Sequence, residues 1–200
     1  MNFLAHLFLS KDNEQEMLGN FIGDFVKGKQ WQNYPLEVQR GIVFHRNIDY
    51  FTDHHPITKK AIDALKPLLG RYAGIAVDVV YDYFLASNFS QYAHTSLEVF
   101  VMRAYKLLQD NEAILPEKVK ELLPYMVSQN WLLNYGNFEG ITQTLTGLTK
   151  RIDYKVNLVE AIPFVQQNLA LYKAYFEEFF SDLQAYKISI DKLEMNVNLV

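Results

Sequence analysis

The chain has 200 residues, half of them hydrophobic, with 14 Phe and 13 Tyr, so intrinsic disorder is excluded and a large aromatic core is expected. Its 19 basic residues are outnumbered by 23 acidic ones, and the net charge of −4 argues against nonspecific nucleic-acid binding, because phosphate backbones need a basic surplus. The absence of cysteine excludes thiol catalysis, cysteine-bound zinc and disulfides.

The first ten residues are apolar but do not have the pattern of a targeting or membrane-spanning segment. They lack a basic leading region, are interrupted by His6, and are followed by the charged pair Lys11 and Asp12. A signal peptide or a membrane span needs a longer apolar run. We therefore expect a cytoplasmic protein with no membrane partner. The sequence carries no signal of an oligomeric state.

Helical spacing of apolar residues is common along the chain and strict alternation is scarce, which predicts an all-α fold. In the first half, glycine and proline positions set the expected helix ends. The predicted helices there are a short opening helix, then residues 14–27, 35–54, 57–65 and 72–88.

The second half continues the helical pattern. Predicted helices cover about residues 97–108, 116–131, 138–151 and 162–185. The last of these has an aromatic stripe typical of core packing, made of Tyr172, Tyr175, Phe176, Phe179 and Phe180. After Lys187 we expect a short extended segment.

The helix over residues 35–54 carries a stripe that begins apolar and becomes ionisable. Spacings of four, three, four and three residues place the following positions on one face: Val38, Ile42, His45, Asp49 and Thr52. A neighbouring apolar stripe comprises Phe44, Ile48 and Phe51. Since the helix is thus buried on adjoining sides, its ionisable side chains are expected to point into the protein.

The helix over residues 72–88 repeats this arrangement with two carboxylates. One stripe comprises Ile75, Asp78, Asp82, Leu85 and Phe89. Like charges four residues apart destabilise an isolated helix by roughly a few tenths of a kcal/mol, and burying them costs several more. A bound cation would remove both penalties at once.

The two earlier helices contribute in the same way. His6 lies among apolar residues, and Asp24 comes three residues after Phe21 and directly before Phe25. Imidazole and carboxylate ligands suit Mn²⁺, Fe²⁺, Mg²⁺ or Zn²⁺. The sequence therefore predicts a site for one or two divalent ions within residues 1–82. Its six candidate ligands are His6, Asp24, His45, Asp49, Asp78 and Asp82.

Each candidate also has an interpretation without metal. His6 could be a hydrogen-bonded core histidine, and His45 with Asp49 could be an ion pair one turn apart. The two aspartates of the helix over residues 72–88 could each pair with an arginine, Arg46 or Arg71. Arg46, next to His45, could alternatively clamp a phosphate.

Several motifs occur together in order along the chain. The first half contains MNFLAHL at residues 1–7, GN at 19–20, GDFVKG at 23–28, HRNID at 45–49, TD at 52–53, and Asp78 followed by YDYFL at 81–85. The second half contains QNWL at 129–132 with Tyr135, and Gly147-Leu148 with Arg151. As a set, these motifs resemble the bacterial acyl carrier protein phosphodiesterases over most of the chain.

That resemblance implies a single HD-domain-like helical bundle over residues 1–200, with the metal site in residues 1–82 and supporting helices over 95–186. It also implies hydrolysis of the phosphodiester that joins 4′-phosphopantetheine to a serine of holo-acyl carrier protein. The implied cofactor is a divalent metal, Mn²⁺ first, with Mg²⁺ or Fe²⁺ as alternatives. No histidine here is followed by aspartate, so His45 and Asp49 would replace the dipeptide that names the HD superfamily.

The resemblance implies roles for single residues as well. All six candidate ligands would hold the ion or ions, and Arg46 would offset negative charge on the phosphoryl group. The proton of the attacking water would pass to Asp24 or Asp82, whichever is not used as a ligand.

An acyl carrier protein is acidic, so a basic docking surface is expected. Its candidate residues are Lys27, Lys29, Arg40, Lys59 and Lys60, which could equally be scattered solvated charges. Two other functions stay open at this point. One is an HD-like phosphohydrolase that acts on a small phosphate metabolite. The other is a noncatalytic helical binding module whose inward aspartates pair with Arg and Lys.

Overall fold

Helices form almost the whole of the computed structural model. The structure describes residues 1–152 and 156–197, with side chains to residue 190, and this part of the chain contains no strand. The predicted all-α class is therefore confirmed. Within the same residues, no helix combines the length and the apolar character needed to cross a membrane.

Short connections join most of the successive α-helices, and longer ones join α2 to α3 and α10 to α11. In the first half they are α1 (Phe3–Leu9), α2 (Glu14–Ile22), α3 (Leu36–His54), α4 (Pro56–Leu69), α5 (Ala73–Ser87) and α6 (Phe89–Tyr92). In the second half they are α7 (Leu97–Asp110), α8 (Glu117–Ser128), α9 (Trp131–Asn134), α10 (Phe138–Thr149), α11 (Ala161–Gln167) and α12 (Leu169–Val197). Five 3₁₀ turns link them, namely η1 (Gly23–Phe25), η2 (Gln30–Asn33), η3 (Gly70–Tyr72), η4 (Glu112–Ile114) and η5 (Leu158–Glu160).

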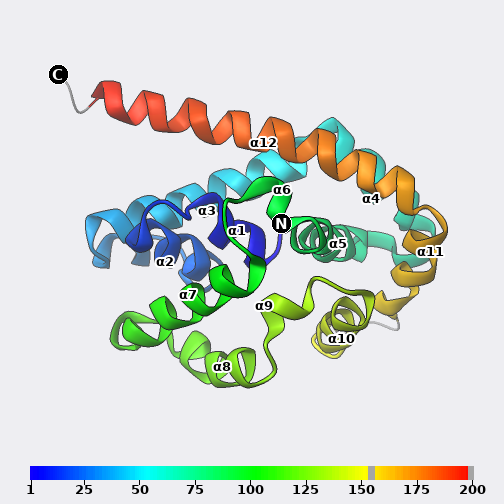
Figure 1. Cartoon of the computed structure of the whole chain (residues 1–200), viewed down its shortest axis with the longest axis horizontal. Coiled ribbons are helices and arrows are strands. Elements are labelled where there is room, and N and C mark those ends of the chain that lie inside the picture. The colour runs from blue at the N-terminus through cyan, green and yellow to red at the C-terminus, as the bar shows by residue number, and fades with distance from the viewer. Residues whose placement is uncertain (153–155, 198–200) are drawn as a thin grey trace.

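Helix α12 runs along one side of the molecule, and α8 and α10 lie on the opposite side (Figure 1). Its aromatic stripe packs against α5, where Tyr81 stacks on Phe179 at 5.0 Å between ring centroids. Phe180 reaches Phe8 of α1 at 5.9 Å. The predicted core role of this stripe is thus confirmed for the part of α12 that faces α1 and α5.

Helices α2 and α3 pack backbone against backbone. Two glycines allow this approach, because a methyl group on Gly19 would overlap the carbonyl oxygen of Val38, and one on Gly41 would overlap that of Glu16. A side chain at either position would push the helices apart. This contact sets the position of His45, which lies one turn beyond Gly41 on α3.

An ion pair ties α12 to α2. Lys187 donates to Glu16 at 2.6 Å, and its ammonium group lies 4.3 Å from the ring centre of Phe44 on α3. Both charged side chains are largely buried. The last helix therefore extends over the end of the molecule that contains α2 and α3.

The structure corrects several predicted helix ends. The helix predicted over residues 14–27 stops at Ile22, because the carbonyl of Asn20, which a continuing helix would use, accepts a hydrogen bond from His45. The segment predicted over 116–131 is interrupted at Asn130, whose φ of 50° is left-handed and tolerable for asparagine.

The helix predicted over residues 162–185 is two helices, α11 and α12, separated at Asn168. The side chain of Asn168 donates to the carbonyl of Phe164 at 2.9 Å and so caps α11 instead of continuing it. The extended segment expected after Lys187 is wrong, since α12 continues to Val197. The final three residues of that segment lie outside the described residues.

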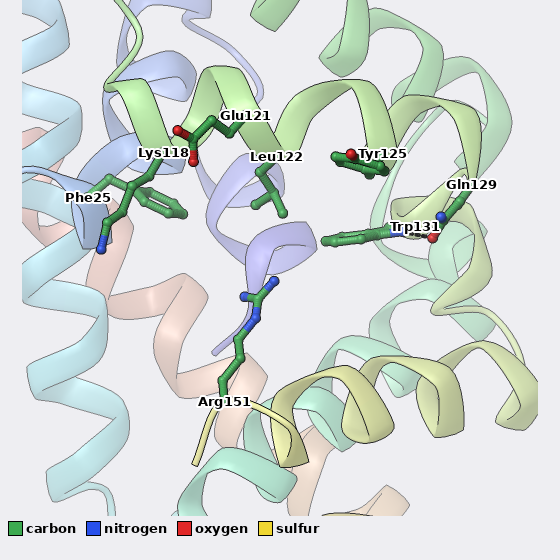
Figure 2. A pocket seen from close by; sticks show the side chains of 8 residues that line it. All are labelled: Phe25, Lys118, Glu121, Leu122, Tyr125, Gln129, Trp131 and Arg151. Atoms are coloured by element: carbon green, nitrogen blue, oxygen red, sulfur yellow. Dashed lines mark hydrogen bonds between the residues drawn. The ribbon is translucent and has the colours of Figure 1, made fainter. Parts of the chain in front are cut away.

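A groove lies beside α8, with η1 and α9 at its edges (Figure 2). We call it the α8 groove. Its lining residues are Phe25, Lys118, Glu121, Leu122, Tyr125, Gln129, Trp131 and Arg151. The Arg151 side chain extends from the end of α10 toward the middle of this groove. The groove therefore lies between helices of the carboxyl-terminal half and the segment that follows α2.

We predict that Gly41→Ala lowers the free energy of unfolding by about 2 kcal/mol or more, because the added methyl overlaps the backbone of α2. The matched control is Gly74→Ala on α5, where the methyl would meet only Ile62 at 3.8 Å. That control should be neutral or stabilising by up to about 1 kcal/mol. Urea unfolding of the three proteins measures both effects, and equal stability of the two variants would contradict the close approach.

Candidate metal centre

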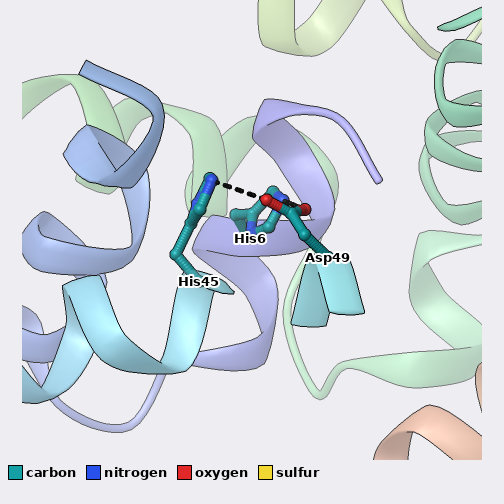
Figure 3. Close-up of side chains that lie close together, drawn as sticks. All are labelled: His6, His45 and Asp49. Atoms are coloured by element: carbon teal, nitrogen blue, oxygen red, sulfur yellow. Dashed lines mark ion pairs between the residues drawn. The ribbon is translucent and has the colours of Figure 1, made fainter. Parts of the chain in front are cut away.

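Two histidines from different helices meet face to face inside the protein. His6 of α1 and His45 of α3 are each only 3% exposed, and their rings stack with centroids 4.0 Å apart (Figure 3). The sequence placed both on inward faces, and the structure brings them together. Because the two rings are in contact, a positive charge on one imidazole disfavours protonation of the other.

Asn20 of α2 orients both rings. Its side-chain oxygen lies 2.8 Å from Nδ1 of His6, and its backbone oxygen lies 2.7 Å from Nδ1 of His45. The amide nitrogen of Asn20 already donates to the His6 carbonyl and to Ser10. Since both oxygens can only accept, Nδ1 of each histidine carries a proton, and each Nε2 is left for another partner.

Both Nε2 atoms face carboxylates. Asp49 lies 3.3 Å from Nε2 of His6 through one oxygen and 3.1 Å from Nε2 of His45 through the other. Figure 3 shows its carboxylate beside the two rings. Asp24 of η1 approaches Nε2 of His45 at 3.2 Å. The side chain of Asp24 is 68% exposed and that of Asp49 is 40% exposed. The buried imidazoles are therefore reached from solvent past the two carboxylates.

The electrostatics of the cluster are those of a site that attracts positive charge. Burial lowers the pKa of His45, but its contacts with Asp24 and Asp49 outweigh this and raise the pKa to about 9. Burial and the neighbouring His45 lower the pKa of His6. Burial alone would raise the pKa of Asp49, and its contacts with the two histidines hold that pKa below the usual range. Asp24 is likewise lowered in pKa by its contact with His45.

The donor set fits a divalent cation. One ligand atom from each of His6, His45 and Asp49 lies within 4.8 Å of the others, the only group of this kind among the described residues. Ligand atoms around one cation with bonds of about 2.1 Å are separated by roughly 3 Å. Each histidine is held at Nδ1 by an oxygen, which is the usual support of a metal-binding imidazole. His6, His45, Asp49 and the adjacent Asp24 could therefore hold an ion.

Asp78 and Asp82 are placed elsewhere, at the start of α1. Asp82 is fully buried and accepts backbone N–H groups of Asn2 at 3.3 Å and Leu4 at 2.8 Å. Asp78 accepts from the amino group of Met1 at 2.8 Å. Asp82 faces inward as its spacing indicates, whereas the side chain of Asp78 is 37% exposed. Both carboxylates hold the first turn of α1 and neither is part of the histidine cluster.

Arg46 is also engaged by the protein itself. Its guanidinium donates to the carbonyls of Val26 at 3.1 Å and Gly28 at 3.2 Å. Among the described residues, neither an aspartate nor a glutamate forms an ion pair with it. Arg46 thus anchors the loop that follows Asp24. The alternative of an aspartate partner is therefore not met among these residues, and the role as a phosphate clamp stays a prediction.

Two residues that shape the site were part of the sequence motifs but were assigned no role there. Asn20 is a fully buried asparagine inside α2, and an asparagine inside a helix among apolar neighbours was the available signal. Gly23 ends α2 where a methyl group would overlap the ring of His45. No pattern in the sequence reports that approach, because it depends on how α2 and α3 pack.

Comparison with known proteins shows which protein family this chain matches. The model of the acyl carrier protein phosphodiesterase family matches residues 1–183. Curated relatives include a protein from Photorhabdus laumondii subsp. laumondii, 33% identical over 90% of this chain and 91% of the relative. One from Enterobacter sp. is 36% identical over 76% of this chain and 79% of its own, and one from Yersinia pestis is 30% identical over 90% and 94%. All three are named acyl carrier protein phosphodiesterase. No solved structure matches this chain.

We predict that Mn²⁺ stabilises the protein through the histidine cluster. At a concentration 100 times the dissociation constant, binding to the folded state should add about 2.7 kcal/mol to the free energy of unfolding. Asp49→Asn should abolish this gain, because it removes the carboxylate between the two histidines. The matched control Asp63→Asn changes an exposed aspartate of α4 and should keep it. Thermal unfolding and calorimetric titration with Mn²⁺ measure the effect. Equal Mn²⁺ affinity in wild type and Asp49→Asn would contradict the site.

We further predict a pH-dependent stability that originates at Asp82. Burial raises the pKa of Asp82 from 3.8 to about 7, although the amides of Leu4 and Asn2 lower it. The charges that face it are the Met1 amino group and Asp78. Between these two pKa values the folded protein binds more protons than the unfolded chain, so the free energy of unfolding falls as pH rises from about 4 to about 7, by roughly a few kcal/mol at most.

The variant Asp82→Asn cannot titrate and should show a shallower decline over this range. Urea unfolding of metal-free wild type and variant at several pH values between about 4 and 8 makes the comparison. Both proteins contain the histidine cluster, so the difference between their curves of unfolding free energy against pH isolates the contribution of Asp82. Parallel curves would show that Asp82 is not the source.

Proposed function

Because this chain belongs to the acyl carrier protein phosphodiesterase family, we propose that it hydrolyses the phosphodiester between 4′-phosphopantetheine and a serine of holo-acyl carrier protein. Water adds to phosphorus, the serine oxygen leaves and takes up a proton, and the products are apo-carrier protein and 4′-phosphopantetheine. The observation that carries the proposal is the cluster of His6, His45 and Asp49 with Asp24 beside it. It lies within the part of the chain that the family model matches.

The residues that would hold a divalent cation are His6, His45 and Asp49, and Asp24 lies beside them without being needed as a ligand. When bound, a divalent cation supplies Lewis acidity toward a phosphoryl oxygen and toward water. Two imidazoles and one carboxylate suit Mn²⁺ or Fe²⁺, and the carboxylate would also accept Mg²⁺. We favour Mn²⁺ because the family resemblance implies it, and the mixed nitrogen and oxygen donors are compatible with that ion.

Asp24 is our candidate for accepting the proton of the attacking water. It is the more exposed of the two carboxylates in the cluster, whereas Asp82, the other candidate, is fully buried and occupied by two backbone amides. A base must reach the water whose proton it accepts. Arg46 contributes by positioning, since it holds the loop behind Asp24.

For the carrier protein, we propose docking near the exposed lysines that follow Asp24. Lys27 and Lys29 are exposed and lie within five residues of that carboxylate. Arg40 is instead paired with Glu37 at 2.6 Å, which reduces the charge it offers to a partner. Acidic carrier proteins are attracted by basic side chains at the rim of a site, mainly through faster association.

We also propose that the helices form one HD-like unit, with the ligands in residues 1–82 and α7 to α12 in support. The arrangement that favours this is the pair His45 and Asp49, one turn apart on α3, completed by His6 from α1. In that arrangement the dipeptide of the HD superfamily is replaced by two residues on one helical face.

The test uses purified full-length chain, Mn²⁺ and holo-acyl carrier protein, followed by intact-protein mass spectrometry. We expect complete conversion to the apo form, loss of conversion with a chelator, and recovery when Mn²⁺ is restored. Asp49→Asn should lower kcat/KM by about 100-fold or more, because the ion is lost. Asp63→Asn should keep wild-type activity.

The possible negative results separate two parts of the proposal. An intact phosphopantetheine arm after long incubation with Mn²⁺ would rule out this substrate and favour a small phosphate metabolite. Full activity in the presence of chelator would rule out the metal.

A further inference from the structure

A second groove begins at Asp24 and runs between the start of α1 and helices α9 and α10. We call it the inner groove. Its volume is about 390 Å³, within the roughly 300–1,000 Å³ that ligand sites span. It shares Phe25, Gln129, Trp131 and Arg151 with the α8 groove, so the two grooves adjoin. A carboxylate of the candidate metal centre thus forms part of the wall of this cavity.

The lining of the inner groove contains both apolar side chains and side chains that can form hydrogen bonds. Its apolar part comprises Phe3, Phe25, Trp131, Tyr135 and Leu148. Its hydrogen-bonding part comprises Asn2, Gln129, Asn134, Gln143 and Thr144. A ligand that fits both parts is a chain of methylene groups interrupted by amides, since each amide needs a partner when it leaves water.

Arg151 supplies the groove with a cation. In Figure 2 its guanidinium points into the space between Phe25 and Trp131. No carboxylate among the described residues forms an ion pair with it, and it lines both grooves. A planar guanidinium binds two oxygens of a phosphoryl group at once. Arg46, the arginine nearest to the cluster along the chain, is already engaged by carbonyls.

We infer that the inner groove binds the 4′-phosphopantetheine arm, with Arg151 on the phosphoryl group. This inference rests on the proposed function. The phosphoryl group lies between Asp24 and Arg151, and the pantetheine chain, which has two amides, extends along Trp131 toward Gln143 and Thr144. The positive charge of Arg151 offsets the repulsion that Asp24 exerts on a phosphodiester. The carrier protein itself stays outside, where the groove opens beside α8.

Gly147 of α10 offers a way to fill the groove without disturbing the fold. It lines the inner groove, and a methyl group placed on it would meet no atom within 4 Å. Gly147→Phe should therefore occupy the space of the arm while leaving the packing of α10 intact. The matched control is Thr146→Phe, at an exposed neighbouring position that is not part of the groove lining.

The experiment compares wild type, Gly147→Phe, Thr146→Phe, Arg151→Gln and Arg151→Lys as Mn²⁺-loaded full-length proteins. The readouts are hydrolysis of holo-acyl carrier protein, Mn²⁺ affinity, and calorimetric binding of free 4′-phosphopantetheine. We expect Gly147→Phe to raise KM at least about tenfold. Arg151→Gln should lower kcat/KM about 100-fold, with partial recovery in Arg151→Lys. Mn²⁺ affinity and melting temperature should stay unchanged throughout, and Thr146→Phe should behave as wild type.

The outcomes distinguish this inference from the proposed function. Wild type that hydrolyses holo-carrier protein, with unchanged kinetics in Gly147→Phe and Arg151→Gln, would overturn the groove assignment alone. Wild type that is inactive on holo-carrier protein but binds 4′-phosphopantetheine, with binding lost in both variants, would overturn the proposed function and keep the groove. Absence of both activity and binding in wild type would overturn both.

Discussion

The close approach of α2 and α3 is the constraint on which the site depends. With glycine at positions 19 and 41 the two backbones touch, and this contact brings the Asn20 carbonyl to His45. One asparagine then fixes two imidazoles through two different oxygens. A site assembled in this way is rigid, because the atoms that orient the rings belong to a helix backbone and to a fully hydrogen-bonded side chain.

This arrangement has a cost in the absence of a cation. Two imidazoles are buried in contact with each other, and two carboxylates compete for their Nε2 atoms. When only one of the two rings is protonated, the other ring is neutral and carries its proton on Nδ1. Its Nε2 lone pair then faces a carboxylate oxygen, which is an unfavourable contact. The rest of the fold, with its large aromatic core along α12, tolerates this local cost.

Much of the fold and part of the site could be predicted from the sequence. Helical periodicity identifies inward faces, so His6, His45 and Asp49 were predicted together. The same argument included Asp82, because periodicity reports which face is buried and not how far along a neighbouring helix it packs. Asp82 meets the first turn of α1 and His6 lies one turn later. The helix breaks at Asn130 and Asn168 escaped prediction because single side-chain and backbone conformations decide them.

The exposed side of the histidine cluster affects how readily a bound cation could exchange with solution. Its imidazoles are buried, whereas Asp24 and Asp49 face solvent. The two carboxylates would therefore be the first groups to replace hydration water on a cation, and the imidazole nitrogens lie deeper. A bound cation could therefore exchange with cations in solution without the opening of a helix. The identity of the bound cation would then depend on the free cation concentrations around the protein and less on those present while the chain folded. Oxygen donors at the entrance would admit hard cations readily, and the deeper nitrogens would retain those with the stronger preference for imidazole.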